Sequence, residues 1–210
     1  MKLNQILESN KSKRLVVVFG GRFQPFHRGH YEAYKWLCKK FGEENVWIAT
    51  SNKTNFNPAN GETSPFTFKE KKEIMVSLYD INPRRIIQCK NPAFKPVEIF
   101  NLYNGYPIIY ITAVGKKDEE RYRTGTFYKP LPLPFVLKDA DALATLDDDV
   151  GYYCEVPMII KDMSGTDVRD TLKSARGDDR EKAFKRYFGK YDSIIDALFI
   201  AKLKDVKEPE

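Results

Sequence analysis

One short segment near the start of the chain constrains its fold more than any other. An apolar, β-branched run, Leu15–Phe19, enters two glycines, Gly20 and Gly21, and a segment of helical character follows His30. A continuous apolar run of this length is typical of a strand that is buried on both faces of a parallel sheet. The order strand, glycine turn and helix therefore predicts the first unit of an α/β fold, with a ligand site at its turn.

The alternation of strands and helices continues along the chain. Further strands are expected at Val46–Thr50, Ile86–Cys89, Pro107–Val114 and Gly151–Ile160. Helices are expected at Tyr31–Phe41, Phe66–Tyr79, Val97–Tyr103, Asp167–Ala175, Asp179–Phe188 and Ser193–Leu203, whereas residues 115–150 are less regular and include a proline-rich stretch. The alternation predicts a Rossmann-like parallel sheet flanked by helices, with C-terminal helices after it. We expect one domain over residues 1–210, with a core at about 15–172 and a helical extension at about 173–205.

Composition excludes several classes of protein. Of the 210 residues, 42% are hydrophobic and 30% charged, which is typical of a folded globular chain rather than a disordered one. No apolar stretch approaches the roughly 20 residues that cross a bilayer, and the N-terminus lacks the apolar centre of a signal peptide. We therefore expect a cytoplasmic protein without a membrane partner.

Cysteine and histidine usage argues against a structural metal or a disulfide framework. The three cysteines, Cys38, Cys89 and Cys154, are far apart, and no pair has the spacing of metal ligands. The chain has only two histidines, His27 and His30. We therefore assign no metal ligands to protein side chains.

The chain is basic, with a net charge of +6 and an isoelectric point near 9.0. Such a balance suits a nucleic-acid binder or an enzyme for polyanionic nucleotides. Lysines and arginines are spread along the whole chain, without a basic run interleaved with aromatic residues. This distribution favours scattered surface charge together with one phosphate-binding focus.

The residues from Gly20 to His30 have the components of a phosphate site, although they match neither G-x-G-x-x-G nor a P-loop. Two glycines, Gly20 and Gly21, let the backbone turn off the strand, and Gly29 allows a ligand to approach the start of the helix. A helix N-terminus presents unpaired N–H groups to an anion. With His27 and His30 on one face of the first turn, two imidazoles can donate hydrogen bonds to one phosphate chain.

A second motif, Ser164-Gly-Thr-Asp-Val-Arg169, has two readings. Ser164 or Thr166 can cap the helix that follows, and Asp167 complements its dipole. The same hydroxyls and N–H groups can hold a phosphate, with Arg169 as a fixed cation.

Together, Gly-Arg-Phe-Gln-Pro-Phe-His-Arg-Gly-His and Ser-Gly-Thr-Asp-Val-Arg resemble the H-x-G-H nucleotidyltransferase superfamily, the cytidylyltransferase-like group. The two motifs are most similar to those of the archaeal type of nicotinamide mononucleotide adenylyltransferase. Two further segments resemble family motifs. Ser64–Lys71 is similar to N-P-F-T-x-x-E-R, with Lys71 where the family has Arg, and Val114–Asp118 is similar to a G-x-D-x loop.

The resemblance implies a set of site residues. The catalytic residues would be His27, His30 and Arg169. The nucleotide-binding residues would be Gly20, Gly21, Arg22, Phe23, Gly29, Gly115, Lys116, Ser164, Gly165 and Thr166. The acceptor-binding residues would be Ser51, Lys53, Phe66, Thr67 and Lys71.

The implied reaction moves AMP from ATP onto a phosphate-bearing acceptor such as nicotinamide mononucleotide, with release of pyrophosphate. The implied cofactor is Mg²⁺, carried by the triphosphate. The partners would be small nucleotides rather than nucleic acid, and the resemblance leaves a homo-oligomer open.

Three alternatives stay open at this level. A cytidylyltransferase would use the same core with CTP and a sugar or polyol phosphate. A regulator that binds nucleotides or nucleic acid without turnover would also fit the basic composition. A fragment of a class I aminoacyl-tRNA synthetase would share H-x-G-H, but this chain is short and lacks K-M-S-K-S.

Overall fold

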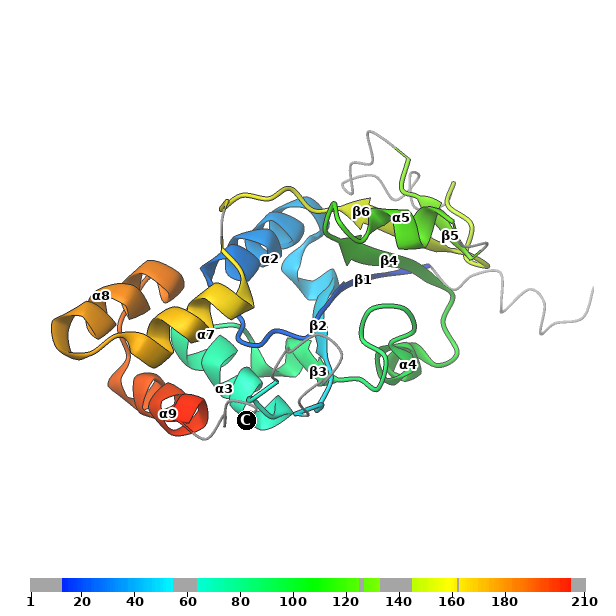
Figure 1. The fold of residues 1–210 in the computed structure, drawn as a ribbon. Helices are drawn as coiled ribbons and strands as arrows, with labels where there is room; N and C mark the ends of the chain where they lie inside the picture. Colours follow the sequence, from blue (N-terminus) through cyan, green and yellow to red (C-terminus); the bar gives the residue numbers. More distant parts are fainter. Residues whose placement is uncertain (1–12, 55–63, 125–126, 133–144, 162, 205–210) are drawn as a thin grey trace, which may run out of the picture.

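A six-stranded parallel sheet forms the centre of the protein in a computed structural model, which describes residues 13–54, 64–124, 127–132, 145–161 and 163–204 (Figure 1). The strands are β1 (Arg14–Gly20), β2 (Val46–Thr50), β3 (Ile86–Gln88), β4 (Ile108–Val114), β5 (Tyr128–Pro130) and β6 (Gly151–Glu155). Their order is β3-β2-β1-β4-β6-β5, and every neighbouring pair is parallel. The predicted Rossmann-like α/β fold is confirmed.

Helices connect the strands and cover both faces of the sheet (Figure 1). The α-helices are α2 (Arg28–Phe41), α3 (Phe68–Tyr79), α4 (Val97–Phe100), α5 (Glu119–Arg123), α7 (Gly165–Ser174), α8 (Gly177–Phe188) and α9 (Ser193–Lys204). Short 3-10 turns, η1 (Glu43–Asn45), η2 (Pro83–Arg85) and η3 (Asn101–Tyr103), precede β2 and β3 and follow α4. Among the described helices, none has the length and apolar character needed to cross a membrane.

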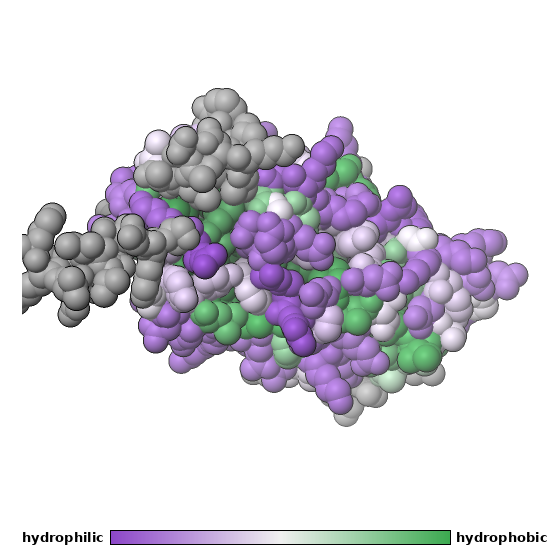
Figure 2. Space-filling model, turned by 180° about the vertical axis from the view of Figure 1, so that it is seen from behind, coloured by the Kyte–Doolittle hydropathy of each residue, from purple (hydrophilic) through white to green (hydrophobic). Residues whose placement is uncertain are grey.

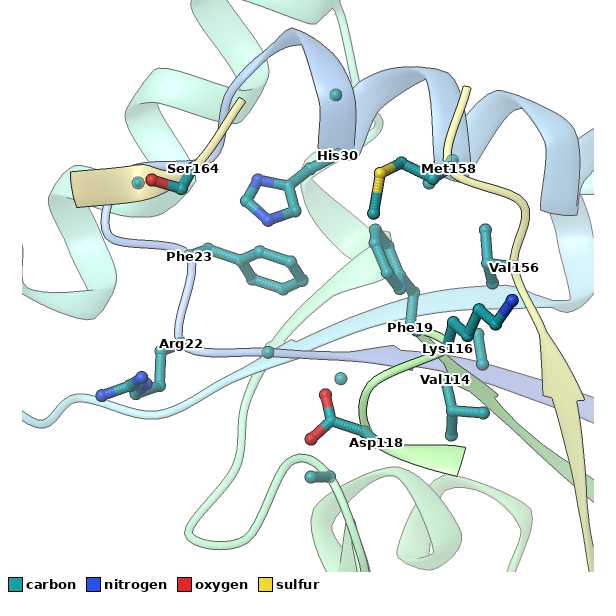
Figure 3. Close-up of a pocket in the computed structure, with 18 of the residues that line it drawn as sticks. Phe19, Arg22, Phe23, His30, Val114, Lys116, Asp118, Val156, Met158 and Ser164 are labelled. Carbon is teal, nitrogen blue, oxygen red and sulfur yellow. The ribbon is translucent and has the colours of Figure 1, made fainter. Parts of the chain in front are cut away.

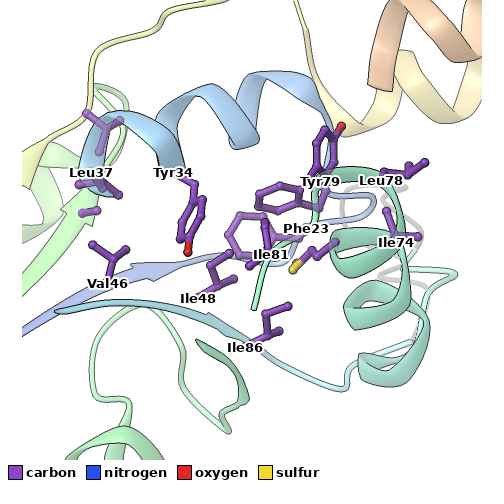
Figure 4. Close-up of a cluster of buried hydrophobic side chains, with 14 of the residues drawn as sticks. Phe23, Tyr34, Leu37, Val46, Ile48, Ile74, Leu78, Tyr79, Ile81 and Ile86 are labelled. Carbon is purple, nitrogen blue, oxygen red and sulfur yellow. The ribbon is translucent and has the colours of Figure 1, made fainter. Parts of the chain in front are cut away.

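Successive residues of β1 point to opposite faces of the sheet, which explains why its whole run is apolar. Leu15 and Val17 join the larger core cluster with side chains from α2, α3, α7, α8 and α9. Figure 4 shows the part of this cluster where side chains of α2 and α3 meet beside β2. Val16 and Val18 lie on the other face, in a smaller cluster with Ile99 of α4. The sheet is therefore covered on both sides at its centre.

The edge strand β5 was not expected, because its residues lie in the proline-rich stretch. Tyr128–Pro130 pairs with β6 alone and forms the end of the sheet. Proline has no N–H for a ladder and is tolerated at a sheet edge. The hydrogen bond that follows the strand runs from the Leu131 amide to the Tyr153 carbonyl at 2.9 Å. A local pattern does not reveal such a strand, since it depends on its neighbour.

The C-terminal helices α8 and α9 pack against the rest of the core through aromatic rings. Phe199 lies 4.8 Å from Phe66 and 5.2 Å from Phe188, between ring centroids. Arg180 of α8 and Asp196 of α9 form a buried ion pair, with Nη2 2.7 Å from Oδ1.

In Figure 2 hydrophilic residues cover most of the visible face, with smaller apolar patches among them.

Candidate active site

A cleft of about 870 Å³ opens at the carboxyl ends of β1, β4 and β6 (Figure 3). Strand β1 has β2 as its neighbour along one edge and β4 along the other, so the strand order reverses at β1. Open α/β sheets bind ligands at such a reversal of strand order. The N-terminal ends of α2 and α7 both contribute to the lining, so two motifs about 130 residues apart in sequence meet here.

His27 and His30 stack on each other at the start of α2. Their ring centroids are 3.7 Å apart, with 28° between the ring planes. His27 is the N-cap residue, and its backbone N–H donates to Nδ1 of His30 at 3.3 Å. Phe23 meets the His30 ring edge-to-face at 5.0 Å. The helix therefore begins three residues earlier than the sequence pattern predicted, because a histidine occupies its cap.

Burial keeps both imidazoles neutral in the ligand-free protein. It lowers the pKa of His27 from 6.5 to about 4, against a weaker opposing effect of the Asp167 carboxylate. The pKa of His30 is lowered well below 6.5 by burial and by the neighbouring His27. Since Nδ1 of His30 accepts the His27 amide, the proton of its neutral ring lies on Nε2. His30 therefore offers one N–H donor at the cleft.

The glycines of the first motif work differently from the expectation. The left-handed residue of the turn is Phe23, with φ 47°, while Gly20 and Gly21 have ordinary φ values. A Cβ on Gly20 would collide with the Pro92 carbonyl, so Gly20 allows the loop after β3 to approach the end of β1. A Cβ on Gly29 would lie 3.1 Å from the His27 ring, so Gly29 makes room for this histidine while it also lines the cleft.

The N-terminus of α7 is docked onto the same turn. Ser164 caps the helix: its Oγ accepts the Asp167 amide at 3.1 Å and donates to the Asp167 carboxylate at 2.6 Å. Arg169 is buried, and its guanidinium donates to the Gln24 carbonyl and, at 3.2 Å, to Oγ1 of Thr166. The capping reading of this motif is therefore confirmed, and Arg169 is a fixed cation that lines the same cleft.

The cleft lining includes every residue that was expected to be catalytic or nucleotide-binding. They are Gly20, Gly21, Arg22, Phe23, His27, Gly29, His30, Gly115, Lys116, Ser164, Gly165, Thr166 and Arg169. The lining also includes the cation Arg121 and the carboxylates Asp118 and Glu155. Within the described part of the chain, no group of three His, Cys, Asp or Glu side chains is arranged to hold a metal ion.

The five expected acceptor-binding residues are not among the lining residues of the cleft. Phe66 is fully buried against Phe199. Its backbone N–H and C=O pair with the side-chain amide of Gln24 in two hydrogen bonds. Thr67 is the N-cap of α3, in a capping box with Glu70. Phe66 therefore serves the core and Thr67 caps a helix, and their expected role at the acceptor stays a prediction.

The other three expected acceptor residues lie near the end of β2. Ser51 and Lys53 follow the strand in sequence, and the Lys71 side chain reaches its last residue. Ser51 is buried and Lys53 is exposed outside the cleft lining. Lys71 was expected to bind the acceptor, and its side chain is completely buried. Its ammonium is enclosed by oxygen atoms of the protein.

Several lining residues were missed from the sequence. Phe94, from the loop after β3, stacks on Tyr122 of α5 with 5.0 Å between centroids and 16° between planes. The Tyr122 hydroxyl donates to the Ala93 carbonyl at 2.7 Å. Met158 and Ile159, after β6, line the opposite side and are 66% and 48% exposed. The apolar run Val156–Ile160 was the available signal in the sequence, and it was read as strand.

Solved structures share this fold. A putative nicotinate-nucleotide adenylyltransferase from Vibrio parahaemolyticus superimposes with a TM-score of 0.52 at 11% identity, over 89% of this chain and 99% of that one. A nicotinic acid mononucleotide adenylyltransferase from Plasmodium falciparum complexed with NaAD gives 0.52 at 12% identity, over 91% and 97%. At these identities the similarity establishes the fold alone.

Sequence comparison is more informative about relationship. Nicotinamide-nucleotide adenylyltransferase 1 from Sulfolobus acidocaldarius is 30% identical over 46% of this chain, which matches 61% of that relative's length. A protein of uncharacterized function from Archaeoglobus fulgidus is 30% identical over 51% of this chain and 57% of its own. The chain thus spans about three fifths of the length of these curated relatives. The cytidylyltransferase-like family model matches residues 18–148, and the chain belongs to that family.

Proposed function

We propose that this protein transfers the adenylyl group of ATP to a phosphate-bearing acceptor, nicotinamide mononucleotide in the first instance, and releases pyrophosphate. The observation that carries the proposal is the meeting of two helix N-termini at one cleft, with His27 and His30 on α2 and Ser164–Thr166 on α7. A polyphosphate bridging these two ends would satisfy both sets of N–H groups. The similarity to an archaeal nicotinamide-nucleotide adenylyltransferase supports this choice of nucleotide and acceptor.

The chemistry needs positioned charge more than it needs a base. An oxygen of the acceptor phosphate attacks the α-phosphorus in line, the bond from that phosphorus to the bridging oxygen breaks, and pyrophosphate leaves. A phosphate acceptor is already ionised at neutral pH, so no side chain has to remove a proton from it. Catalysis then rests on orientation and on stabilising the charge that develops at the α-phosphate.

The neutral imidazole of His30 suits this role. Its Nε2–H is held in place because Nδ1 accepts the His27 amide, and a fixed donor needs no reorganisation during the reaction. Arg169 would take the leaving pyrophosphate, since its guanidinium is buried at the start of α7 and faces the cleft.

A divalent cation would enter as part of the substrate. Mg²⁺ is held chiefly by phosphate oxygens and water, with one or two carboxylates, rather than by a cage of protein ligands. The cleft fits this mode, because Asp118 and Glu155 both line it. The ion would supply charge neutralisation of the triphosphate.

A screen for pyrophosphate release tests the proposal. The full chain is incubated with Mg²⁺ and each of ATP, CTP, GTP and UTP, against acceptors that include nicotinamide mononucleotide, nicotinic acid mononucleotide and a polyol phosphate. We expect pyrophosphate release that requires ATP and nicotinamide mononucleotide together, with the dinucleotide as the other product.

The other outcomes separate the competing functions. Release with CTP and a polyol phosphate would overturn adenylyl transfer in favour of cytidylyl transfer. Salt-dependent binding to RNA or DNA, without release from any triphosphate, would identify a regulator instead.

A further inference from the structure

Lys71 of α3 lies outside the cleft, yet it is tied to one of the cleft's segments. Its side chain is completely buried. The ammonium donates to the Arg22 carbonyl at 3.1 Å, to Oγ1 of Thr50 at 2.8 Å and to the Ser51 carbonyl at 2.5 Å. Three partners match the three donors of an ammonium group. One side chain therefore joins the end of β2 to the segment that follows β1.

The segment held by Lys71 includes the strained residue of the first motif. The Arg22 carbonyl also accepts the Thr50 hydroxyl at 3.2 Å, so it receives two hydrogen bonds from side chains. The next residue, Phe23, has φ 47°, a conformation that costs a residue other than glycine about 1–2 kcal/mol. A strained turn persists only where its surroundings hold it. Lys71 and Thr50 supply that restraint directly before the turn.

The chemistry of the Lys71 site argues against a role in stability alone. All three partners are neutral oxygens and none is a carboxylate, so the positive charge is not compensated. Burial lowers the pKa of Lys71 from 10.5 to about 8, which reflects the cost of keeping that charge out of water. A well-packed apolar residue often serves stability better than a buried charge. The ammonium is best explained by the three oxygens that it brings together.

We propose that Lys71 is a positioning residue, whose ammonium holds the Arg22–Phe23 turn and thereby places Arg22 for the triphosphate. The proposal rests on the proposed function, since it names the anion that Arg22 meets. Lys71 itself touches neither substrate nor reacting atoms. Its contribution therefore passes through Arg22, and this gives it a specific signature.

A double-mutant cycle on nucleotide binding provides the test. A non-hydrolysable ATP analogue is titrated into the full chain, so that binding is measured apart from turnover. We expect Arg22→Ala and Lys71→Met each to weaken binding about tenfold, as loss of one charge-assisted contact does. The double variant should also be weakened about tenfold, because residues that act through each other are not additive. A hundredfold loss in the double variant would overturn the proposal.

Two variants control for the fold. Lys69→Met makes the same change at an exposed position on α3, and wild-type affinity is expected there. Lys71→Arg keeps a cation that can reach the same oxygens and should recover most of the affinity. If Lys71→Met fails to fold, Thr50→Val replaces it in the cycle, because it removes the other side-chain donor to the Arg22 carbonyl.

Hydrogen exchange separates this proposal from the proposed function. The Gly21 amide donates to the Ala49 carbonyl at 3.0 Å and reports on the segment that Lys71 holds. We expect faster exchange over residues 20–24 in Lys71→Met and no change in Lys69→Met. A wild-type protein that binds no nucleotide would refute the proposed function, and this measurement would still report on Lys71. Unchanged exchange in Lys71→Met would refute the positioning role.

Discussion

The backbone amide of His27 donates a hydrogen bond to Nδ1 of His30, and the two rings stack with 3.7 Å between their centroids. This relationship fixes the His30 tautomer and leaves Nε2–H as the donor that the proposed reaction would use. Removing one such donor typically costs roughly 10²–10³ in turnover. We therefore expect His30→Ala to lose turnover by about that factor in the pyrophosphate-release assay, measured at a temperature where the variant is folded.

A neighbouring variant gives the control for His30→Ala. Arg28 lies on the same turn of α2 but is exposed and absent from the cleft lining, so Arg28→Ala should keep wild-type turnover. Turnover of His30→Ala equal to that of Arg28→Ala would remove His30 from the mechanism.

The burial of His27 makes stability depend on pH. Its pKa is 6.5 in an exposed chain and about 4 in the folded protein, so between these values the unfolded chain binds more protons. The free energy of unfolding should therefore fall as the pH drops from about 6.5 to about 4. The total effect of this group is about 3 kcal/mol.

Urea unfolding at a series of pH values from 4 to 7 measures this effect. His27→Gln cannot titrate, and its unfolding free energy should fall less steeply over the same interval. Carboxylates such as Glu70 contribute to both curves and cancel in the difference between the variants. Parallel curves for wild type and His27→Gln would contradict the assignment.

Gly165 allows α7 to approach the turn of the first motif. A Cβ at this position would lie 2.8 Å from the Gln24 carbonyl oxygen, a backbone atom that cannot move easily. Gly165→Ala should therefore destabilise the protein by about 1–3 kcal/mol, the usual cost of overpacking. The matched change is Gly115→Ala, where nothing lies within 4 Å of the new methyl group. Chemical denaturation of both variants checks the difference, and equal stabilities would be inconsistent with this contact.

The ion pair between Arg180 and Asp196 joins α8 to α9, and the Tyr191 hydroxyl also donates to the same carboxylate at 3.2 Å. Asp196→Ala would leave a buried guanidinium without its carboxylate, and we expect a loss of about 3–5 kcal/mol. Replacing both partners in Arg180→Met with Asp196→Leu should recover most of it, because no buried charge remains. Denaturant unfolding of the single and double variants tests this. A double variant as unstable as Asp196→Ala would show that packing, not charge, holds the helices together.

Local patterns were sufficient to predict the parallel sheet and the residues around the histidines. The apolar run in β1 reports burial on both faces, and a glycine turn followed by a helix marks a ligand site in this class of fold. They were insufficient for β5, which is a strand only because β6 lies beside it. They also did not reveal that Phe66 is a core side chain and that Thr67 caps a helix.

The sequence by itself determined the α/β fold and the pairing of His27 with His30, since both depend on residues close together in the chain. Only the tertiary structure decided which distant groups meet. It placed Arg169 on the Gln24 carbonyl, 145 residues away, and Lys71 on the Arg22 carbonyl, 49 residues away. A lysine in a helical pattern reads as surface charge, and its burial depends on acceptors from other elements. Both residues make long-range hydrogen bonds to the same turn, but Arg169 lines the cleft whereas Lys71 lies outside it.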